Sequence, residues 1–230
     1  IELDTPGGVL TPALEICKLI KGMRDDGMRV YAWVNKDAYS GGTIIALATD
    51  GIVMARNATI GDCQPIMMSP GGAAPLPEGI EAKATSPLLA ELRDSSRRNG
   101  YPLDMVLALI RPKMELFWVR NSETGESRFV DAEERDRLFG LARVPSASDS
   151  EEGDAADEST TRPVSGEASR TAWQYVQASP ELEDVVQPVV GTRSLLTMRT
   201  PEALAYGFAI GTANDRDALR SLFNVTGDIT

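Results

Sequence analysis

The feature that most constrains the fold is an alternation of strand-like runs and glycine turns near the start of the chain. Three short runs are typical of buried strands, namely Ile1–Asp4, Arg29–Asn35 and Ile52–Ala55. Residues 11–27 and 43–50, which lie between them, have helical character, and the first begins with a Thr-Pro pair. A strand–helix–strand–helix–strand order predicts right-handed crossovers. We therefore expect an α/β fold with a largely parallel sheet and helices on its faces.

Two turns at the ends of these strands are candidates for a site, because ligands of such sheets bind at the carboxyl ends of the strands. Gly7-Gly8 follows the first strand, and Ser40 follows the second within Ala38–Gly42 (AYSGG). A serine between a strand and a helix exposes its hydroxyl, and the amides of the helix's first turn point the same way. Taken alone, the pattern is more typical of a plain turn.

The first helix has apolar residues at the three- to four-residue spacing of a buried stripe. We expect this stripe to contain Leu14, Cys17, Ile20 and Met23, joined by Ile16 and Leu19.

The segment after the third strand is interpreted as a turn at Asn57–Gly61 and a long loop at Gln64–Gly79. The loop is rich in proline, glycine and methionine, a composition that suits a mobile surface segment as well as a substrate-binding flap. If it is a flap, then Ile66, Met67 and Met68 are its expected apolar contacts.

The rest of the chain divides by composition. Helices are expected at 80–98 and 103–111, a β-hairpin at 115–130, a helix at 131–141, and short helices and a strand between 200 and 223. Residues 149–158 carry six carboxylates and no basic residue, so we expect disorder there. The predicted units are a core at 1–114, a hairpin–helix insertion at 115–141, a disordered acidic linker at 142–170, and the C-terminal part of the core at 171–230.

Composition excludes several classes of function. A net charge of −11 argues against nucleic acid as a partner. No stretch approaches the roughly 18–20 apolar residues that span a bilayer.

Ile1 begins abruptly inside a strand pattern, so we expect a fragment of a longer protein. Cys17 and Cys63 are not expected to pair, and no metal site or cofactor is expected.

The chain contains no histidine, which removes the Ser-His-Asp triad and the Cys-His pair. If Ser40 is a nucleophile, its base must be a lysine or a carboxylate. A lysine base must be neutral, so its pKa has to fall from about 10.4 toward 7–8. Among the five lysines, Lys83 suits this role best because it stands near a helix N-terminus between alanines. By itself, an ordinary surface lysine is the commoner interpretation.

Several motifs in order give the chain a family resemblance. Ile1–Gly8 (IELDTPGG), Ala38–Thr43 (AYSGGT) and Ala58–Asp62 (ATIGD) with Gln64-Pro65-Ile66 closely resemble the membrane-associated serine proteases of the NfeD type. These belong to the ClpP/crotonase superfamily, alongside the signal peptide peptidase SppA. Thr200–Gly207 (TPEALAYG) is similar to a C-terminal element of the same family. The resemblance covers about residues 1–115 and 190–225.

The resemblance implies a ClpP/crotonase-like core and a serine endopeptidase with a Ser-Lys dyad. Ser40 matches the nucleophile, Lys83 the base, and Gly8 and Gly41 the oxyanion-hole amides. It also implies hydrophobic substrates from membrane proteins, such as stomatin-like partners, a homo-oligomer, and a membrane-associated full-length protein of the cell envelope. The fragment itself is expected to be soluble. The family's first strand and helix, its membrane spans and its small C-terminal barrel have no counterpart here.

Two other functions fit the same fold. A crotonase-like acyl-CoA enzyme shares the two-amide oxyanion hole but needs no serine at position 40. A non-catalytic scaffold for membrane partners would need no contact between Ser40 and Lys83.

Overall fold

The computed structural model describes residues 1–69, 72–76, 78–141 and 171–224. Its largest element is a six-stranded sheet in the order β10-β4-β2-β3-β11, with β1 also paired to β2. All pairs in this sheet are parallel except β10 with β4. The strands are β1 (Glu2–Thr5), β2 (Tyr31–Tyr39), β3 (Gly51–Met54), β4 (Thr59–Gly61), β10 (Thr197–Arg199) and β11 (Ala209–Thr212).

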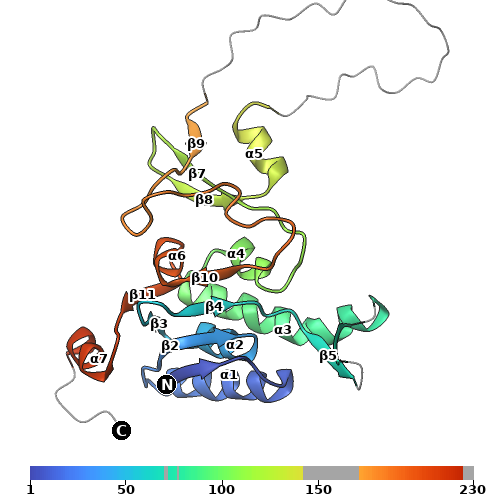
Figure 1. Ribbon diagram of the computed structural model, residues 1–230, viewed down its shortest axis with the longest axis vertical. Coiled ribbons are helices and arrows are strands. Elements are labelled where there is room, and N and C mark those ends of the chain that lie inside the picture. The colour runs from blue at the N-terminus through green and yellow to red at the C-terminus, as the bar shows by residue number, and fades with distance from the viewer. Residues whose placement is uncertain (70–71, 77, 142–170, 225–230) are drawn as a thin grey trace, which may run out of the picture.

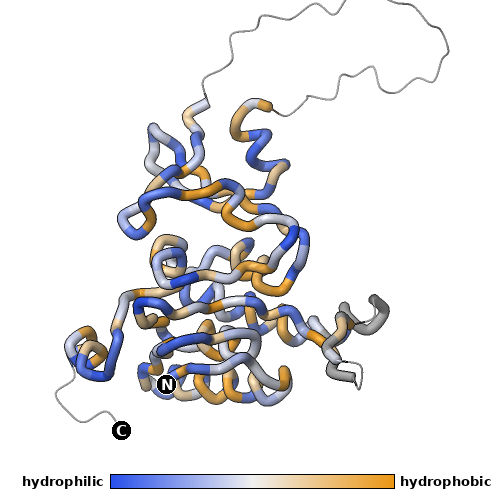
Figure 2. Tube along the Cα trace, in the orientation of Figure 1, coloured by the Kyte–Doolittle hydropathy of each residue, from blue (hydrophilic) through white to orange (hydrophobic). Residues whose placement is uncertain are grey.

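Helices pack against this sheet and enclose the main hydrophobic core (Figure 1). They are α1 (Leu10–Asp25), α2 (Gly41–Ala48), α3 (Glu78–Asn99), α4 (Leu103–Ala108) and α6 (Thr200–Ala205). A further helix, α7 (Arg216–Phe223), packs on a separate small cluster with Trp33 and Val53. In α2 every residue except Ile45 is buried. Figure 2 shows hydrophobic segments along these central elements and also at the opposite end of the molecule. Because apolar burial stabilises the fold most, the helix that follows Ser40 is part of the most firmly held region.

The predicted order of strands and helices in the first part of the chain is confirmed, but β2 is longer than expected. It continues through Tyr39 because Asp37–Tyr39 pair with Thr59–Gly61. The turn predicted at Asn57–Gly61 is therefore wrong for its second half, which forms β4. The loop predicted at Gln64–Gly79 is also wrong in part, because it contains the antiparallel hairpin of β5 (Ile66–Ser69) and β6 (Gly72–Pro75).

The apolar stripe predicted for the first helix is only partly buried. Cys17 and Ile20 are buried in α1, but the side chains of Ile16 and Leu19 are 42% and 60% exposed. Helical spacing places both apolar residues near the stripe, but it does not show how wide a face of the helix is buried by other elements. The prediction that they join the buried stripe is wrong.

A second, smaller sheet lies at one end of the molecule, beside α6 and away from the centre of the core (Figure 1). The predicted hairpin is confirmed as β7 (Phe117–Asn121) paired with β8 (Ser127–Val130). The helix after it is α5 (Ala132–Leu138). A third strand, β9 (Trp173–Tyr175), pairs with β7. The acidic segment predicted to be disordered, 142–170, lies outside the described residues.

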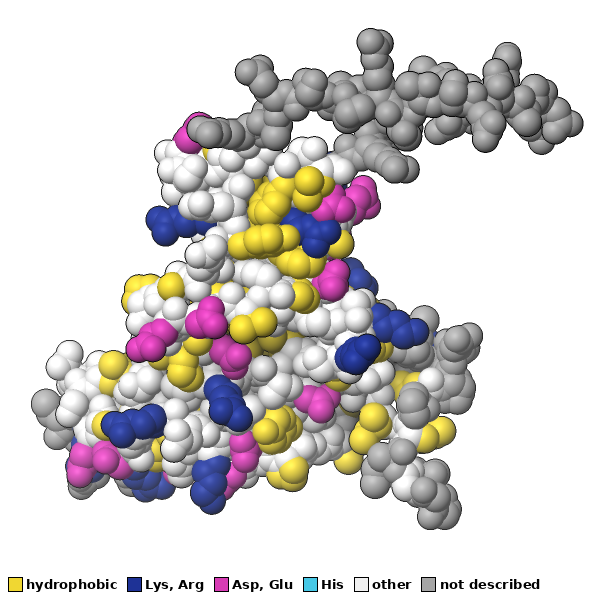
Figure 3. Space-filling view, turned by 45° about the horizontal axis from the view of Figure 1, so that its top comes forward, with side chains coloured by type: hydrophobic (Ala, Val, Ile, Leu, Met, Phe, Trp, Pro, Cys, Tyr) yellow, Lys and Arg dark blue, Asp and Glu magenta, His cyan; other side chains and the backbone are white. Residues whose placement is uncertain are grey.

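Aromatic rings join this sheet to the core. Trp118 and Phe129 each meet the ring of Tyr206 edge-on, with ring centroids 5.5 and 5.4 Å apart. On the face drawn in Figure 3, basic and acidic side chains are interspersed over the core, and hydrophobic side chains gather over the smaller sheet.

Candidate functional site

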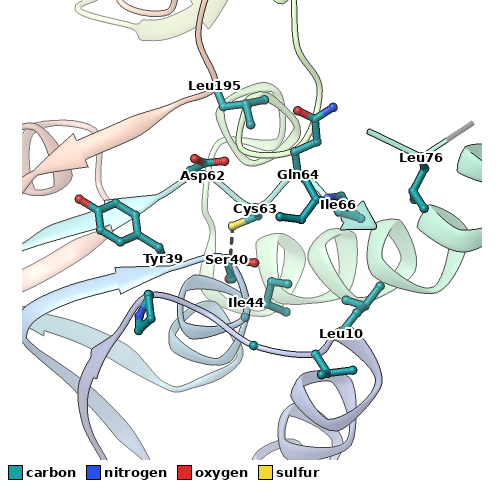
Figure 4. A pocket seen from close by; sticks show the side chains of 15 residues that line it. Leu10, Tyr39, Ser40, Ile44, Asp62, Cys63, Gln64, Ile66, Leu76 and Leu195 are labelled. Atoms are coloured by element: carbon teal, nitrogen blue, oxygen red, sulfur yellow. Dashed lines mark hydrogen bonds between the residues drawn. The ribbon is translucent and has the colours of Figure 1, made fainter. Parts of the chain in front are cut away.

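A cleft of about 1100 Å³ opens where β1 and β2 end. It is lined by 15 residues, most of them apolar, and Figure 4 shows Ser40 at its centre. Three of the residues predicted for the site, Gly8, Ser40 and Gly41, line this cleft together with Ile66. The two strand ends singled out in the sequence therefore lie at one edge of the sheet.

Ser40 occupies a strained turn between β2 and α2, with φ 52° and ψ −118°. Positive φ in a residue with a Cβ costs about 1–3 kcal/mol, so the surrounding contacts must hold it. The Ser40 amide donates hydrogen bonds to the carbonyl oxygens of Gly61 (3.1 Å) and Asp62 (3.0 Å). Its carbonyl oxygen accepts from the amide of Ile44 at 3.1 Å. The hydroxyl makes no hydrogen bond with any described residue, so it is available to react with a bound ligand.

The backbone around Ser40 packs so closely that a side chain at some neighbouring positions would clash, which explains the glycines there. A Cβ on Gly7 would lie 2.6 Å from Ser40 Cβ, and Gly7 itself has φ +114°. A Cβ on Gly41 would lie 3.4 Å from the amide nitrogen of Gly8, so the backbones of these two glycines are close together. Neither amide donates to an acceptor in the described part of the chain. Two unpaired N–H groups beside a serine hydroxyl have the composition of an oxyanion hole.

A buried threonine that the sequence reasoning missed holds this turn together. Thr43 is fully buried, and its hydroxyl can donate to the carbonyl oxygen of Ala38 (2.5 Å) or of Gly61 (2.9 Å). The same oxygen accepts the amide of Gly61 at 3.0 Å. Thr43 thereby joins α2 to the ends of β2 and β4, on both sides of Ser40. A threonine inside an apolar helix start was the only sequence signal for this role.

Cys63, also missed as a cleft residue, contacts the backbone of the same turn. Its thiol donates to the carbonyl oxygen of Ser40 at 3.6 Å. Burial raises the pKa of the Cys63 thiol to about 12. The thiolate is the nucleophilic form of cysteine, so this group is a hydrogen-bond donor at neutral pH and not a competing nucleophile.

The predicted base and flap residues lie farther out. Lys83 is an exposed residue of α3, does not line the cleft, and makes no hydrogen bond to Ser40 Oγ. Ile66 lines the cleft although its side chain is 56% exposed. Met67, 43% exposed, is on β5 but does not line the cleft. Met68 is also on β5, and its side chain lies outside the described part of the structure.

Other lysines have structural partners. Lys21 on α1 is buried, with its Nζ 2.6 Å from Glu91 Oε1 and 2.6 Å from Asp94 Oδ2 on α3. The hydrogen bond and charge of Lys21 lower the pKa of Asp94 below its usual value. Lys36 pairs with Asp4 at the surface. The ion pairs of Lys21 therefore hold α1 against α3.

Replacing Lys21 with methionine is expected to lower the free energy of unfolding at pH 7 by about 3 kcal/mol, because Glu91 loses its ion-pair partner and Asp94 keeps only its pairs with Arg97 and Arg98. A lowered pKa in the folded state stabilises the fold above the pKa of an unfolded aspartate, about 3.9. That contribution is lost as the pH falls through the lower folded value. The difference between parent and Lys21→Met in urea unfolding should therefore shrink below about pH 4.

The matched control for this prediction is Lys36→Met, which removes an exposed pair with Asp4. Its effect should stay within about 1 kcal/mol. Equal losses in both variants, or a difference that does not change with pH, would contradict the prediction.

The family model for the N-terminal domain of NfeD1b matches residues 1–137, more than half of the chain. The chain belongs to the NfeD1b family. Membrane protein NfeD1b of Bacillus subtilis (strain 168) is 33% identical to it over 115 residues, or 50% of this chain and 24% of that protein. An uncharacterized protein of Methanocaldococcus jannaschii is 36% identical over 80 residues, or 35% of this chain and 26% of that protein. This NfeD1b chain spans about a quarter of the length of these relatives.

Solved structures of the 1510-N membrane-bound stomatin-specific protease have the same fold as this NfeD1b chain. A lysine-to-alanine mutant in complex with a substrate peptide aligns with a TM-score of 0.52 at 20% identity, covering 96% of this chain and 63% of that one. A serine-to-alanine mutant aligns with a TM-score of 0.52 at 19% identity, covering 96% and 66%. The α/β fold of ClpP/crotonase type predicted from the sequence is thus confirmed. Among the described residues, no helix is both long enough and apolar enough to cross a membrane.

Proposed function

We propose that this NfeD1b chain contains the catalytic domain of a serine endopeptidase in which Ser40 is the nucleophile. The observation that carries the proposal is the strained turn of Ser40 in an apolar cleft, with the unpaired amides of Gly8 and Gly41 beside it. Acyl transfer by serine requires a free hydroxyl and donors for the developing oxyanion, and both lie here.

In the proposed reaction, neutral Lys83 removes the proton from Ser40 Oγ as Oγ attacks the carbonyl carbon of a peptide bond. The amides of Gly8 and Gly41 donate to the resulting oxyanion. Collapse of this intermediate breaks the C–N bond, and Lys83 returns the proton to the leaving amine. Water then attacks the ester carbonyl on Ser40 with Lys83 again as the base. Lys83 returns the proton to Ser40 Oγ as the C–O bond breaks, which releases the new carboxyl terminus.

This mechanism requires Lys83 to approach Ser40 when substrate binds. Leu76 and Ile66 line the cleft, and Leu76 lies between β6 and the start of α3, the helix that carries Lys83. A peptide that contacts these residues therefore contacts the segment leading to the base. Catalytic hydrogen bonds commonly tighten only in the complex with substrate.

The apolar lining of the cleft favours hydrophobic peptide segments, with Ile66 as a contact and Met67 and Met68 on the same strand. We include membrane proteins in the substrate class, with stomatin-like proteins as candidates, because the structural neighbours are described as stomatin-specific. We further propose that the full-length protein is associated with a membrane of the cell envelope and acts as a homo-oligomer.

Labelling with a fluorophosphonate probe, followed by mass spectrometry of the modified peptide, tests the nucleophile. We expect modification at Ser40 in the parent and none in Ser40→Ala. Ser194→Ala, which removes an exposed serine that does not line the cleft, serves as the control and should label like the parent. Modification that persists in Ser40→Ala would exclude Ser40 as the reactive group.

One observation favours a second candidate, a non-catalytic scaffold. Ser40 Oγ and Lys83 share no hydrogen bond in the unbound chain. A scaffold would bind apolar peptides without cleaving them, and Ser40 would show no more reactivity toward the probe than other exposed serines.

A further inference from the structure

One cleft residue has no part in the proposed chemistry. Asp62 is the only charged side chain among the residues that line the cleft. Its side chain is exposed, and its carboxylate makes no hydrogen bond or ion pair with any residue the structure describes. An unpaired carboxylate at the edge of an apolar cleft is free to bind a group brought by the substrate.

The backbone holds Asp62 at a defined place beside Ser40. The carbonyl oxygen of Asp62 accepts the amide of Ser40 at 3.0 Å, and the amide of Asp62 donates to Leu196 on the other side at 3.1 Å. Asp62 has φ 49°, a left-handed conformation that aspartate and asparagine adopt more readily than most residues. The position of the Asp62 backbone relative to the nucleophile is therefore set by main-chain hydrogen bonds.

Asp62 lies across Ser40 from three apolar residues of the cleft, and Leu195 lies on its own side. In Figure 4, Leu10, Ile44 and Leu76 lie on one side of Ser40, and Asp62 lies on the other side, toward Tyr39.

We propose that Asp62 selects substrates with a lysine or arginine within about two residues of the scissile bond, on the side of Ser40 opposite Leu10, Ile44 and Leu76. This inference rests on the proposed peptidase function. An extended peptide advances about 3.3 Å per residue, so only residues close to the cleaved bond can reach Asp62. The preferred substrate would be the boundary of an apolar segment, where hydrophobic residues give way to a basic one. Such boundaries flank many membrane segments.

The experiment uses apolar peptides in which lysine, glutamine or glutamate is placed in turn at each of the three positions on either side of the cleaved bond. Cleavage by the whole chain is followed by mass spectrometry at low and high salt. At one position, we expect the order lysine, glutamine, glutamate, with kcat/KM for lysine about three- to tenfold above that for glutamine at low salt. The ratio should fall as salt is added.

Asp62→Asn should bring the three peptides toward equal rates at that position, because it removes the charge and keeps the shape and the backbone conformation. Glu183→Gln is the matched control. It removes one exposed carboxylate outside the cleft, so the order of the three peptides should persist. Loss of the order in both variants would mean that net charge, not Asp62, sets the preference.

The outcomes separate this inference from the function on which it rests. Cleavage that depends on Ser40 but shows no lysine preference at any position, or a preference that survives Asp62→Asn, overturns the inference alone. Absence of any cleavage that depends on Ser40 overturns the peptidase function and the inference together.

Discussion

Ser40→Ala is expected to lower kcat for an apolar peptide by about 10⁴-fold or more, with little change in KM. The hydroxyl oxygen forms the bond to the substrate, and loss of a nucleophile removes covalent catalysis while leaving the apolar cleft and the amides of Gly8 and Gly41 in place. The measurement is the rate of peptide cleavage by mass spectrometry, with peptide binding measured in parallel.

Lys83→Ala extends the same prediction to the base, with an expected loss of at least about 10²-fold. The matched control is Lys18→Ala, because Lys18 is an exposed lysine on α1 that does not line the cleft. Loss of activity in Lys83→Ala alone supports the dyad. Activity of Lys83→Ala equal to that of the parent would show that another group takes the proton from Ser40.

The second large effect is expected for Gly61→Ala, which should lower the free energy of unfolding by about 3 kcal/mol or more. Gly61 has φ +148°, and a Cβ there would lie 2.5 Å from the carbonyl oxygen of Leu196 and 2.6 Å from Thr197 Cα. Both are backbone atoms at the junction with β10, so β4 and β10 would have to separate. Urea unfolding followed by circular dichroism measures the loss.

Gly125→Ala is the matched control for Gly61→Ala. Gly125 also has a positive φ, +76°, but a Cβ there would meet nothing within 4 Å. Only the conformational cost remains, about 1 kcal/mol. If the two variants lose equal stability, the close approach of β4 and β10 does not contribute and the steric argument is wrong.

Short-range patterns predicted the parts of this fold that depend on neighbouring residues in the chain. The strands and helices of the first part follow from apolar spacing and from glycine and proline positions. The hairpin of β7 and β8 follows from two β-prone runs around Thr124-Gly125. The placement of Gly8, Ser40 and Gly41 at one edge followed from the topology, because parallel strands end on the same side of a sheet.

Elements that depend on distant partners could not be predicted in this way. The three residues of β4 are a strand because β2 and β10 pair with them from both sides. Ile16 and Leu19 have the same spacing as buried residues, but the described structure leaves them exposed. The spacing of apolar residues along a helix does not show which of them are buried by another element.

The sequence by itself determined the order of the core elements, the serine turn and the exclusion of histidine chemistry. Only the tertiary structure decided that Thr43 joins the turn to two strands, and that Cys63 and Asp62 lie in the cleft with Ser40. It also placed Lys21 in an ion pair and Lys83 outside the cleft. The physical reason is that local preferences depend on backbone sterics and apolar spacing within a few residues. Contacts across the cleft depend on how separate elements pack.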